Sequence, residues 1–327
     1  MPRQTVLSLV LAAVALIAAP GMADGRTLVV GDGSASCPDG RYRTIQAAVD
    51  AARPGDHIPV CPGRYTETVN VGTPRLQIFS RKRDAAFVQL PADQAFQTAF
   101  SLFTTGTTVR GFIFEPAEQS CEPAGRVLEA FGGATFAQNR VQGTGCSRFN
   151  DGVIKFFEDF PGEFSVVDNF ISGFEEFGVR ARRGRNTLNG NTILGGRLGM
   201  HLEGGKTVVQ ANKIEDAGAG VFADGFDNGS FDLWVAGNRL GGNGLGIVAR
   251  DFGVGSATRV PLALRIQANS VLNSVQDGIT VDFAPGLVTG NRSLGSGGLD
   301  CVMRHGFATW KDNVGVTDSP SNLCRAP

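Results

Sequence analysis

The chain has 327 residues, of which 45 are glycine and 15 proline, and 19% are charged. This composition is typical of a turn-rich β protein and differs from that of a disordered chain. The formal net charge of −1 lacks the basic excess that accompanies nucleic-acid binding, so no nucleic-acid partner is expected.

The first residues have the pattern of a secretory signal peptide. Arg3 precedes an apolar run over 6–19, and the small residues Gly-Met-Ala come directly before Asp24. We therefore predict a signal peptide over 1–23, one domain over 24–327, and a secreted or periplasmic location. No later apolar run is long enough for a membrane span, so none is expected.

Six cysteines follow the predicted cleavage site. An even number of cysteines in an exported chain indicates disulfides, with buried free thiols as the alternative. If each cysteine pairs with the next one along the chain, the disulfides join Cys37 to Cys61, Cys121 to Cys146, and Cys301 to Cys324.

The segment after the cleavage site predicts a short helix. Apolar residues recur at helical spacing, Thr44 is a suitable N-cap, and Pro54 with Gly55 ends the helix. The stripe consists of Ile45, Ala48, Val49 and Ala52. A stack of strands exposes an apolar end, so we expect residues from about 24 to 56 to cap it.

Residues 57–116 contain short β-favouring runs, HIPV, TVNV, LQIFS, AFVQL, FSLF and TVRGFIF. Pro59 fits an edge or first-rung strand, because it lacks the N–H of a central strand. Phenylalanines recur through the apolar positions, and stacked aromatic ladders in the core explain most of them, as at Phe112, Phe114, Phe131, Phe136, Phe170 and Phe174.

From 136 to 314 one pattern recurs at intervals of 21 to 31 residues, with apolar residues on both sides of an asparagine. The asparagines are Asn139, Asn169, Asn191, Asn212, Asn238, Asn269, Asn291 and Asn313. Repeats of this size bury their apolar face by stacking, and the short runs indicate strands that form parallel sheets. Each asparagine then lies at the same bend, bonds to the rungs on both sides, and adopts the left-handed dihedrals of the bend.

This frame of Asn and Gly resembles the right-handed parallel β-helix of the pectin-lyase-like superfamily. The stretches TIQAAVDAARPGD and CPGRYTETVNV also resemble the entry segment of pectinesterases. The resemblance implies an all-β parallel β-helix with an N-terminal capping α-helix. That fold serves lyases, hydrolases, esterases, epimerases and non-catalytic proteins, and the sequence has no counterpart of the esterase motifs or of the epimerase DPHD motif.

Alternation along the strand after each repeat glycine predicts two outward columns that point to solvent. Two residues past the glycine the column contains Ile154, Arg180, His201, Phe222, Val248, Thr280 and Asp300. Four residues past it the column contains Phe156, Arg182, Glu203, Asp224, Arg250, Asp282 and Val302. By resemblance, this sheet forms the substrate cleft, and we expect insertions at about 143–163, 224–231 and 251–261 beside it.

Glu203, Asp224 and Arg250 are the candidate catalytic residues. Adjacent carboxylates bind Ca²⁺ or act as an acid and base pair, so Glu203 and Asp224 are also the candidate Ca²⁺ ligands. Arg250 resembles the arginine base of β-elimination in pectate lyases. Arg180, Arg182, His201 and Asp282 are the candidate substrate-binding residues. The alternative is an ordinary solvated sheet face whose opposite charges pair between rungs.

The sequence thus favours a secreted, monomeric β-helix protein that binds a polysaccharide or cell-surface glycan. The alternative is a polysaccharide lyase or glycoside hydrolase acting on an acidic, uronate-containing polysaccharide. No cofactor other than Ca²⁺ is expected.

Overall fold

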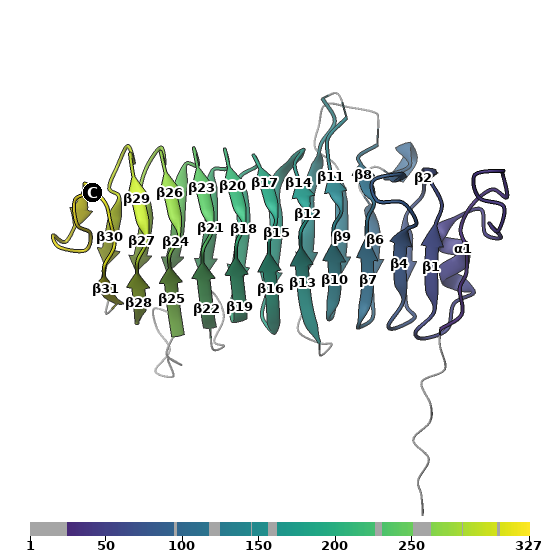
Figure 1. Ribbon diagram of the computed structural model, residues 1–327, viewed down its shortest axis with the longest axis horizontal. Coiled ribbons are helices and arrows are strands. Elements are labelled where there is room, and N and C mark those ends of the chain that lie inside the picture. Colours follow the sequence, from purple (N-terminus) through teal and green to yellow (C-terminus); the bar gives the residue numbers. More distant parts are fainter. Residues whose placement is uncertain are drawn as a thin grey trace, which may run out of the picture.

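The computed structural model describes residues 25–94, 97–117, 125–144, 146–155, 162–225, 231–250, 263–282, 284–305 and 308–327. The predicted signal peptide lies outside these residues. The chain forms a right-handed parallel β-helix, in which successive rungs stack along one long axis (Figure 1). The predicted fold class is confirmed.

Three parallel sheets, here called A, B and C, run the length of the solenoid. Sheet A contains β1 (His57–Val60), β4 (Gln77–Ser80), β7 (Thr107–Arg110), β10 (Ala134–Ala137), β13 (Glu163–Val167), β16 (Arg185–Asn189), β19 (Gly205–Gln210), β22 (Phe231–Ala236), β25 (Ala263–Gln267), β28 (Gly286–Thr289) and β31 (Ala308–Lys311). Sheet B contains β2 (Gly63–Thr66), β5 (Ala86–Gln89), β8 (Ile113–Glu115), β11 (Arg140–Val141), β14 (Phe170–Ile171), β17 (Thr192–Leu194), β20 (Lys213–Glu215), β23 (Arg239–Gly241), β26 (Ser270–Leu272) and β29 (Arg292–Leu294).

Sheet C follows sheet B in each rung and positions the candidate site. It contains β3 (Val69–Val71), β6 (Thr98–Leu102), β9 (Arg126–Ala130), β12 (Phe149–Lys155), β15 (Phe174–Arg182), β18 (Leu198–Glu203), β21 (Ala219–Asp224), β24 (Leu245–Arg250), β27 (Ile279–Asp282), β30 (Cys301–Arg304) and β32 (Asp318–Ser319). A short 3₁₀ helix, η1 (Ala92–Gln94), precedes β6.

A short helix, α1 (Ile45–Asp50), packs on the first rung as predicted. The Thr44 side chain accepts a hydrogen bond from the Ala47 N–H, and Ile45, Ala48 and Val49 are buried. Strand β1 is the first strand of sheet A, so Pro59 lies in the first rung, one of its two predicted positions. Residues 27–30 bridge to the other side of β1, where the Pro59 carbonyl accepts from the Val30 N–H at 2.9 Å.

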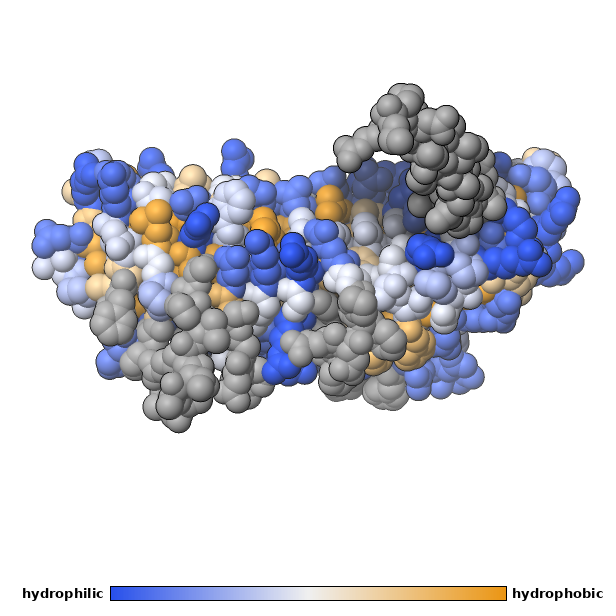
Figure 2. All heavy atoms as spheres, turned by 90° about the horizontal axis from the view of Figure 1, so that it is seen from below, coloured by the Kyte–Doolittle hydropathy of each residue, from blue (hydrophilic) through white to orange (hydrophobic). Residues whose placement is uncertain are grey.

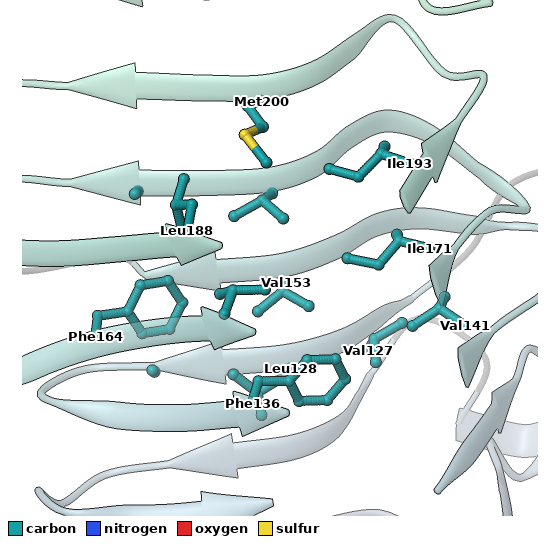
Figure 3. Packing of buried hydrophobic residues seen from close by; sticks show 14 of the residues in the cluster. Val127, Leu128, Phe136, Val141, Val153, Phe164, Ile171, Leu188, Ile193 and Met200 are labelled. Carbon is teal, nitrogen blue, oxygen red and sulfur yellow. The ribbon is translucent and has the colours of Figure 1, made fainter. Parts of the chain in front are cut away.

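The core is a continuous stack of apolar side chains between the three sheets (Figure 3). Phe112, Phe114 and Phe136 form an aromatic series, with ring centroids 6.0 and 5.5 Å apart. Two of the phenylalanines assigned to the core lie elsewhere. Phe131 stacks on the exposed ring of Phe103, and the Arg140 guanidinium lies over Phe170, 4.4 Å from its ring centroid.

The eight repeat asparagines form a buried ladder at the bend between sheets A and B, as predicted. The pattern is clear at Asn212, whose backbone N–H and side-chain amide both donate to Asn238 Oδ1, at 2.9 and 3.0 Å. The same amide donates to the Leu188 carbonyl of the preceding rung, at 2.9 Å. Because all eight residues are at most 2% exposed, these bonds satisfy groups that water cannot reach.

The prediction that the asparagines themselves adopt the left-handed dihedrals of the bend is wrong. Positive φ occurs at the residue before each asparagine, for example at Ala211 (53°) and Ala268 (52°). The asparagines themselves have no positive φ among the described residues. The preceding residue makes the turn, and the asparagine then aligns its amide along the solenoid axis.

Disulfides join Cys37 to Cys61 and Cys301 to Cys324, which confirms two of the three predicted pairs. Cys146 is also disulfide-bonded. Its predicted partner, Cys121, lies outside the described residues. Within the part of the chain that the structure describes, no helix is both long and apolar enough to cross a membrane.

Candidate functional site

Strand register brings the candidate residues together on the outer face of sheet C. Arg182, Glu203, Asp224, Arg250 and Asp282 are paired in register on the consecutive strands β15, β18, β21, β24 and β27. We call this set the charged column. The neighbouring column contains Arg180, His201, Phe222, Val248 and Thr280, as the repeat predicts.

The last rung is shifted from the predicted register. Asp282 pairs with Arg304, and Thr280 pairs with Val302. The predicted columns take Gly298 as the repeat glycine of this rung. However, Ile279 pairs with Cys301, so Asp300 lies opposite Gly278 and takes the place of the glycine. Arg304 therefore continues the charged column on β30. Val302 and Asp300 do not occupy the positions predicted for them.

The prediction that both columns are open to solvent is wrong at their centre. The alternation is correct, since Met200 and Leu202 point into the core while His201 and Glu203 lie on the other side of β18. However, His201, Glu203 and Asp224 are each only 8% exposed. Long neighbouring side chains, including Arg180 and Phe177, pack over this part of the sheet.

Glu203 lies between two arginines. Arg180 Nη2 donates to Glu203 Oε1 at 2.7 Å, and Arg182 Nε forms an ion pair with Oε2. The carboxylate is nine-tenths buried, whereas 22% of the Arg180 side chain and 30% of the Arg182 side chain remain exposed. The accessible groups at this point of the face thus belong to arginine side chains.

His201 connects Glu203 with Asp224. Its Nε2 lies 3.3 Å from Asp224 Oδ2 and 3.6 Å from Glu203 Oε1. The imidazole stacks on Phe177, with centroids 5.4 Å apart, and meets Phe222 edge-on at 5.6 Å. Within the described structure His201 Nδ1 and Asp224 Oδ1 are buried without a hydrogen-bond partner.

Arg250 follows Asp224 in the charged column. Its guanidinium carbon lies 4.3 Å from the centroid of the Phe222 ring. Burial lowers the pKa of Arg250 below its ordinary value, although the negative charges of Asp224 and Asp282 act in the opposite direction. Asp282 Oδ1 in turn lies 3.3 Å from His305 Nδ1.

One ligand atom from each of His201, Glu203 and Asp224 lies within 4.8 Å of the other two. Such a group of an imidazole and two carboxylates can share a proton or contact a cation. Glu203 is already paired with both arginines and Asp224 Oδ2 faces the imidazole, which leaves Asp224 Oδ1 without a partner among the described residues.

Phe177, Phe103 and Phe131 lie outside the two positions counted from each glycine, so the repeat does not predict them on this face. Phe177 and the predicted column residue Phe222 enclose His201, and Phe103 stacks with Phe131 farther along sheet C. The predicted insertion at 251–261 lies outside the described residues, as do 226–230 of the second insertion and residues 145 and 156–161 of the first.

A separate cavity of about 280 Å³ lies near the N-terminal cap, far along the chain from the charged column. Its lining includes Arg43, Arg64, Tyr65 and Glu67. Tyr65 Oη already donates to the Cys61 carbonyl, and Glu67 accepts from the Ile45 and Gln46 N–H groups. The Glu67 bonds join the first rung to the cap and the Tyr65 bond lies within that rung, so we assign this cavity no function.

Comparison with protein-family models and with curated proteins gives no match. Among solved structures, the chain is similar to the Dettilon tailspike protein (13% identity, TM-score 0.49), covering 85% of this chain and 59% of the tailspike. It is also similar to the PL6-family alginate lyase AlyGC (11% identity, TM-score 0.43), covering 94% of this chain and 39% of the lyase.

A third similar structure is the A-module of the Azotobacter vinelandii mannuronan C-5 epimerase AlgE4 (9% identity, TM-score 0.45), covering 85% of this chain and 95% of that module. At these identities the likeness concerns architecture and carries no assignment of chemistry. The chain is a right-handed parallel β-helix protein, as its Asn and Gly frame predicts.

Proposed function

We propose that the protein binds acidic, uronate-containing glycans on the outer face of sheet C and performs no chemistry on them. One observation carries this proposal: Glu203 and Asp224, two carboxylates of the charged column, are buried beside Arg180, Arg182 and His201, while the two arginine side chains remain partly exposed. Glu203 has 9% of its side chain exposed, against 30% for Arg182. An arginine fork matches the geometry of a carboxylate, so this face suits an anionic sugar.

In this proposal the buried carboxylates position the arginines. Like charges on adjacent rungs would repel, and Glu203 and Asp224 lie in register on β18 and β21. Arg180 and Arg182 relieve this repulsion at Glu203, and His201 lies beside Asp224. We therefore propose a charge ladder here in place of the Ca²⁺ site, since Ca²⁺ requires six to eight oxygen ligands. The two disulfides support a location outside the reducing cytoplasm.

The test is calorimetric titration of the mature protein with a polyuronate oligosaccharide. Arg182→Gln should weaken binding by about tenfold, the loss expected for one charge-assisted contact. Arg197→Gln is the matched control, because Arg197 is also paired with a glutamate but is 68% exposed in the turn that precedes β18. Equal binding by the wild type and Arg182→Gln would refute the proposal.

A second candidate function is cleavage of the same class of polymer. It is favoured by one observation, the lowered pKa of Arg250 beside Asp224 and Asp282. A partly buried arginine of this kind is the group that would take a proton in β-elimination. Analysis of the products released from a polyuronate separates this function from simple binding.

A further inference from the structure

Two phenylalanines form a stacked pair on sheet C, outside the core. Phe103 directly follows β6 and Phe131 directly follows β9, strands that lie side by side in the solenoid (Figure 1). Their ring centroids are 4.9 Å apart and their planes differ by 19°. Phe103 is 49% exposed, although burial of a phenyl ring is strongly favourable.

The pair lies in line with the charged column. Leu102 pairs with Ala130, Ala130 with Lys155, and Lys155 with Ala181. Phe131 follows Ala130 as Arg182 follows Ala181, so both occupy the same position in their rungs. Two rung spacings separate them, which is about 10 Å along the solenoid axis.

Charged residues lie on β9, the strand that precedes Phe131. Arg126, at the start of β9, pairs with Glu129 on the same strand and with Asp151 on β12. Burial would lower the pKa of Arg126, but the hydrogen bonds from Asp151 and Glu129 outweigh it and raise that pKa. The guanidinium therefore stays charged, and 38% of its side chain remains exposed.

We infer that Phe103 and Phe131 form a stacking subsite for a sugar ring of an acidic oligosaccharide whose uronate reaches Arg180 and Arg182. This inference rests on the proposed function and adds to it the direction of the ligand, along the solenoid axis. The apolar face of a sugar ring packs on an aromatic ring, while Arg126 and Glu129 supply partners for hydroxyl groups.

The size and surroundings of the pair favour a glycan over a second protein. A stable protein interface buries roughly 800 Å² on each partner, and two rings provide far less apolar area. Seen from below, the coloured part of the surface has separate hydrophobic patches among hydrophilic residues (Figure 2). The ligand is therefore expected to be polar, with only local apolar faces.

The test compares short and long ligands by calorimetry. Phe103→Ala should weaken binding of a polyuronate oligosaccharide about five- to tenfold, the effect expected when an exposed aromatic contact is lost. Binding of a uronate monosaccharide, which reaches only the arginines, should not change. Val316→Ala is the control, since Val316 is 69% exposed near the other end of the solenoid.

A second variant tests stacking directly. Phe103→Trp should keep the affinity of the wild type, and its indole fluorescence should change when the oligosaccharide is added. If Phe103→Ala binds the oligosaccharide like the wild type and Arg182→Gln binds it more weakly, the stacking subsite is refuted and the proposed function stands. If neither variant loses affinity, both fail. A dimer in sedimentation that Phe103→Ala dissociates would assign the rings to a second copy and also overturn the inference.

Discussion

At the bend between sheets A and B, each repeat asparagine satisfies backbone groups that the sheets leave unpaired. A corner interrupts the sheet ladder and leaves backbone groups buried without partners. The asparagine amide supplies both donor and acceptor: Asn238 Nδ2 donates to the Val209 carbonyl at 3.0 Å and to Asn269 Oδ1 at 2.9 Å, and Asn238 Oδ1 accepts from the Asn212 N–H at 2.9 Å. A side chain with only one of these functions could not make all three bonds.

Replacement of Asn238 with Ala should therefore lower the free energy of unfolding by on the order of 1 to 3 kcal/mol, since it leaves buried partners unsatisfied. Chemical denaturation measures the change. Gln210→Ala is the control, because Gln210 lies partly exposed on β19 in a neighbouring rung. Variants of equal stability would show that the ladder contributes nothing.

Sequence could predict this ladder because the asparagine recurs at one place in the repeat. It could not predict which residue makes the turn, because Ala211, Asp168 and Gly190 all take the left-handed conformation before an asparagine. The structure of the bend selects that conformation, not the residue type. Burial of His201, Glu203 and Asp224 was missed for a related reason, since alternation gives the side of a strand but not what packs over it.

At the scale of the strands, register decides which charges meet. The Gly and Asn frame correctly placed Arg182, Glu203, Asp224, Arg250 and Asp282 in one column. It failed at β30, where Asp300 replaces the glycine. The Asp300 carboxylate accepts hydrogen bonds from the Ser296 and Val316 N–H groups, so a C-terminal turn is fixed there by a residue outside the repeat.

The two ends of the solenoid are held by disulfides with sequence separations of 24 and 23 residues. A loop of this length is worth roughly 3 kcal/mol in the chain-entropy description. Cys301→Ala with Cys324→Ala should therefore lower stability by about that amount. Peptide mapping without reductant should find 37 with 61, 301 with 324, and 121 with 146. Any other partner for Cys146 would contradict the third pair.

At the scale of the whole molecule, the stacked rungs make a long rigid surface on which distant residues align. Phe103, Phe131, Arg182 and Arg304 lie on separate turns of the chain, but sheet C sets them along one axis. Such a scaffold suits an extended polymer, because the periodic surface offers repeated contacts. The fold followed from the sequence repeat, whereas the function depends on side-chain pairing that only the structure reveals.

The most direct test of the account is to incubate the mature protein with a panel of polyuronates, with and without Ca²⁺, and to measure both binding and products. The account predicts bound but intact polymer, with no new reducing ends and no unsaturated products. Titration with Ca²⁺ should give no more heat than the control Glu203→Gln with Asp224→Asn. Release of unsaturated oligosaccharides that disappears in Arg250→Gln would contradict the account and establish the outer face of sheet C as the active site of a lyase.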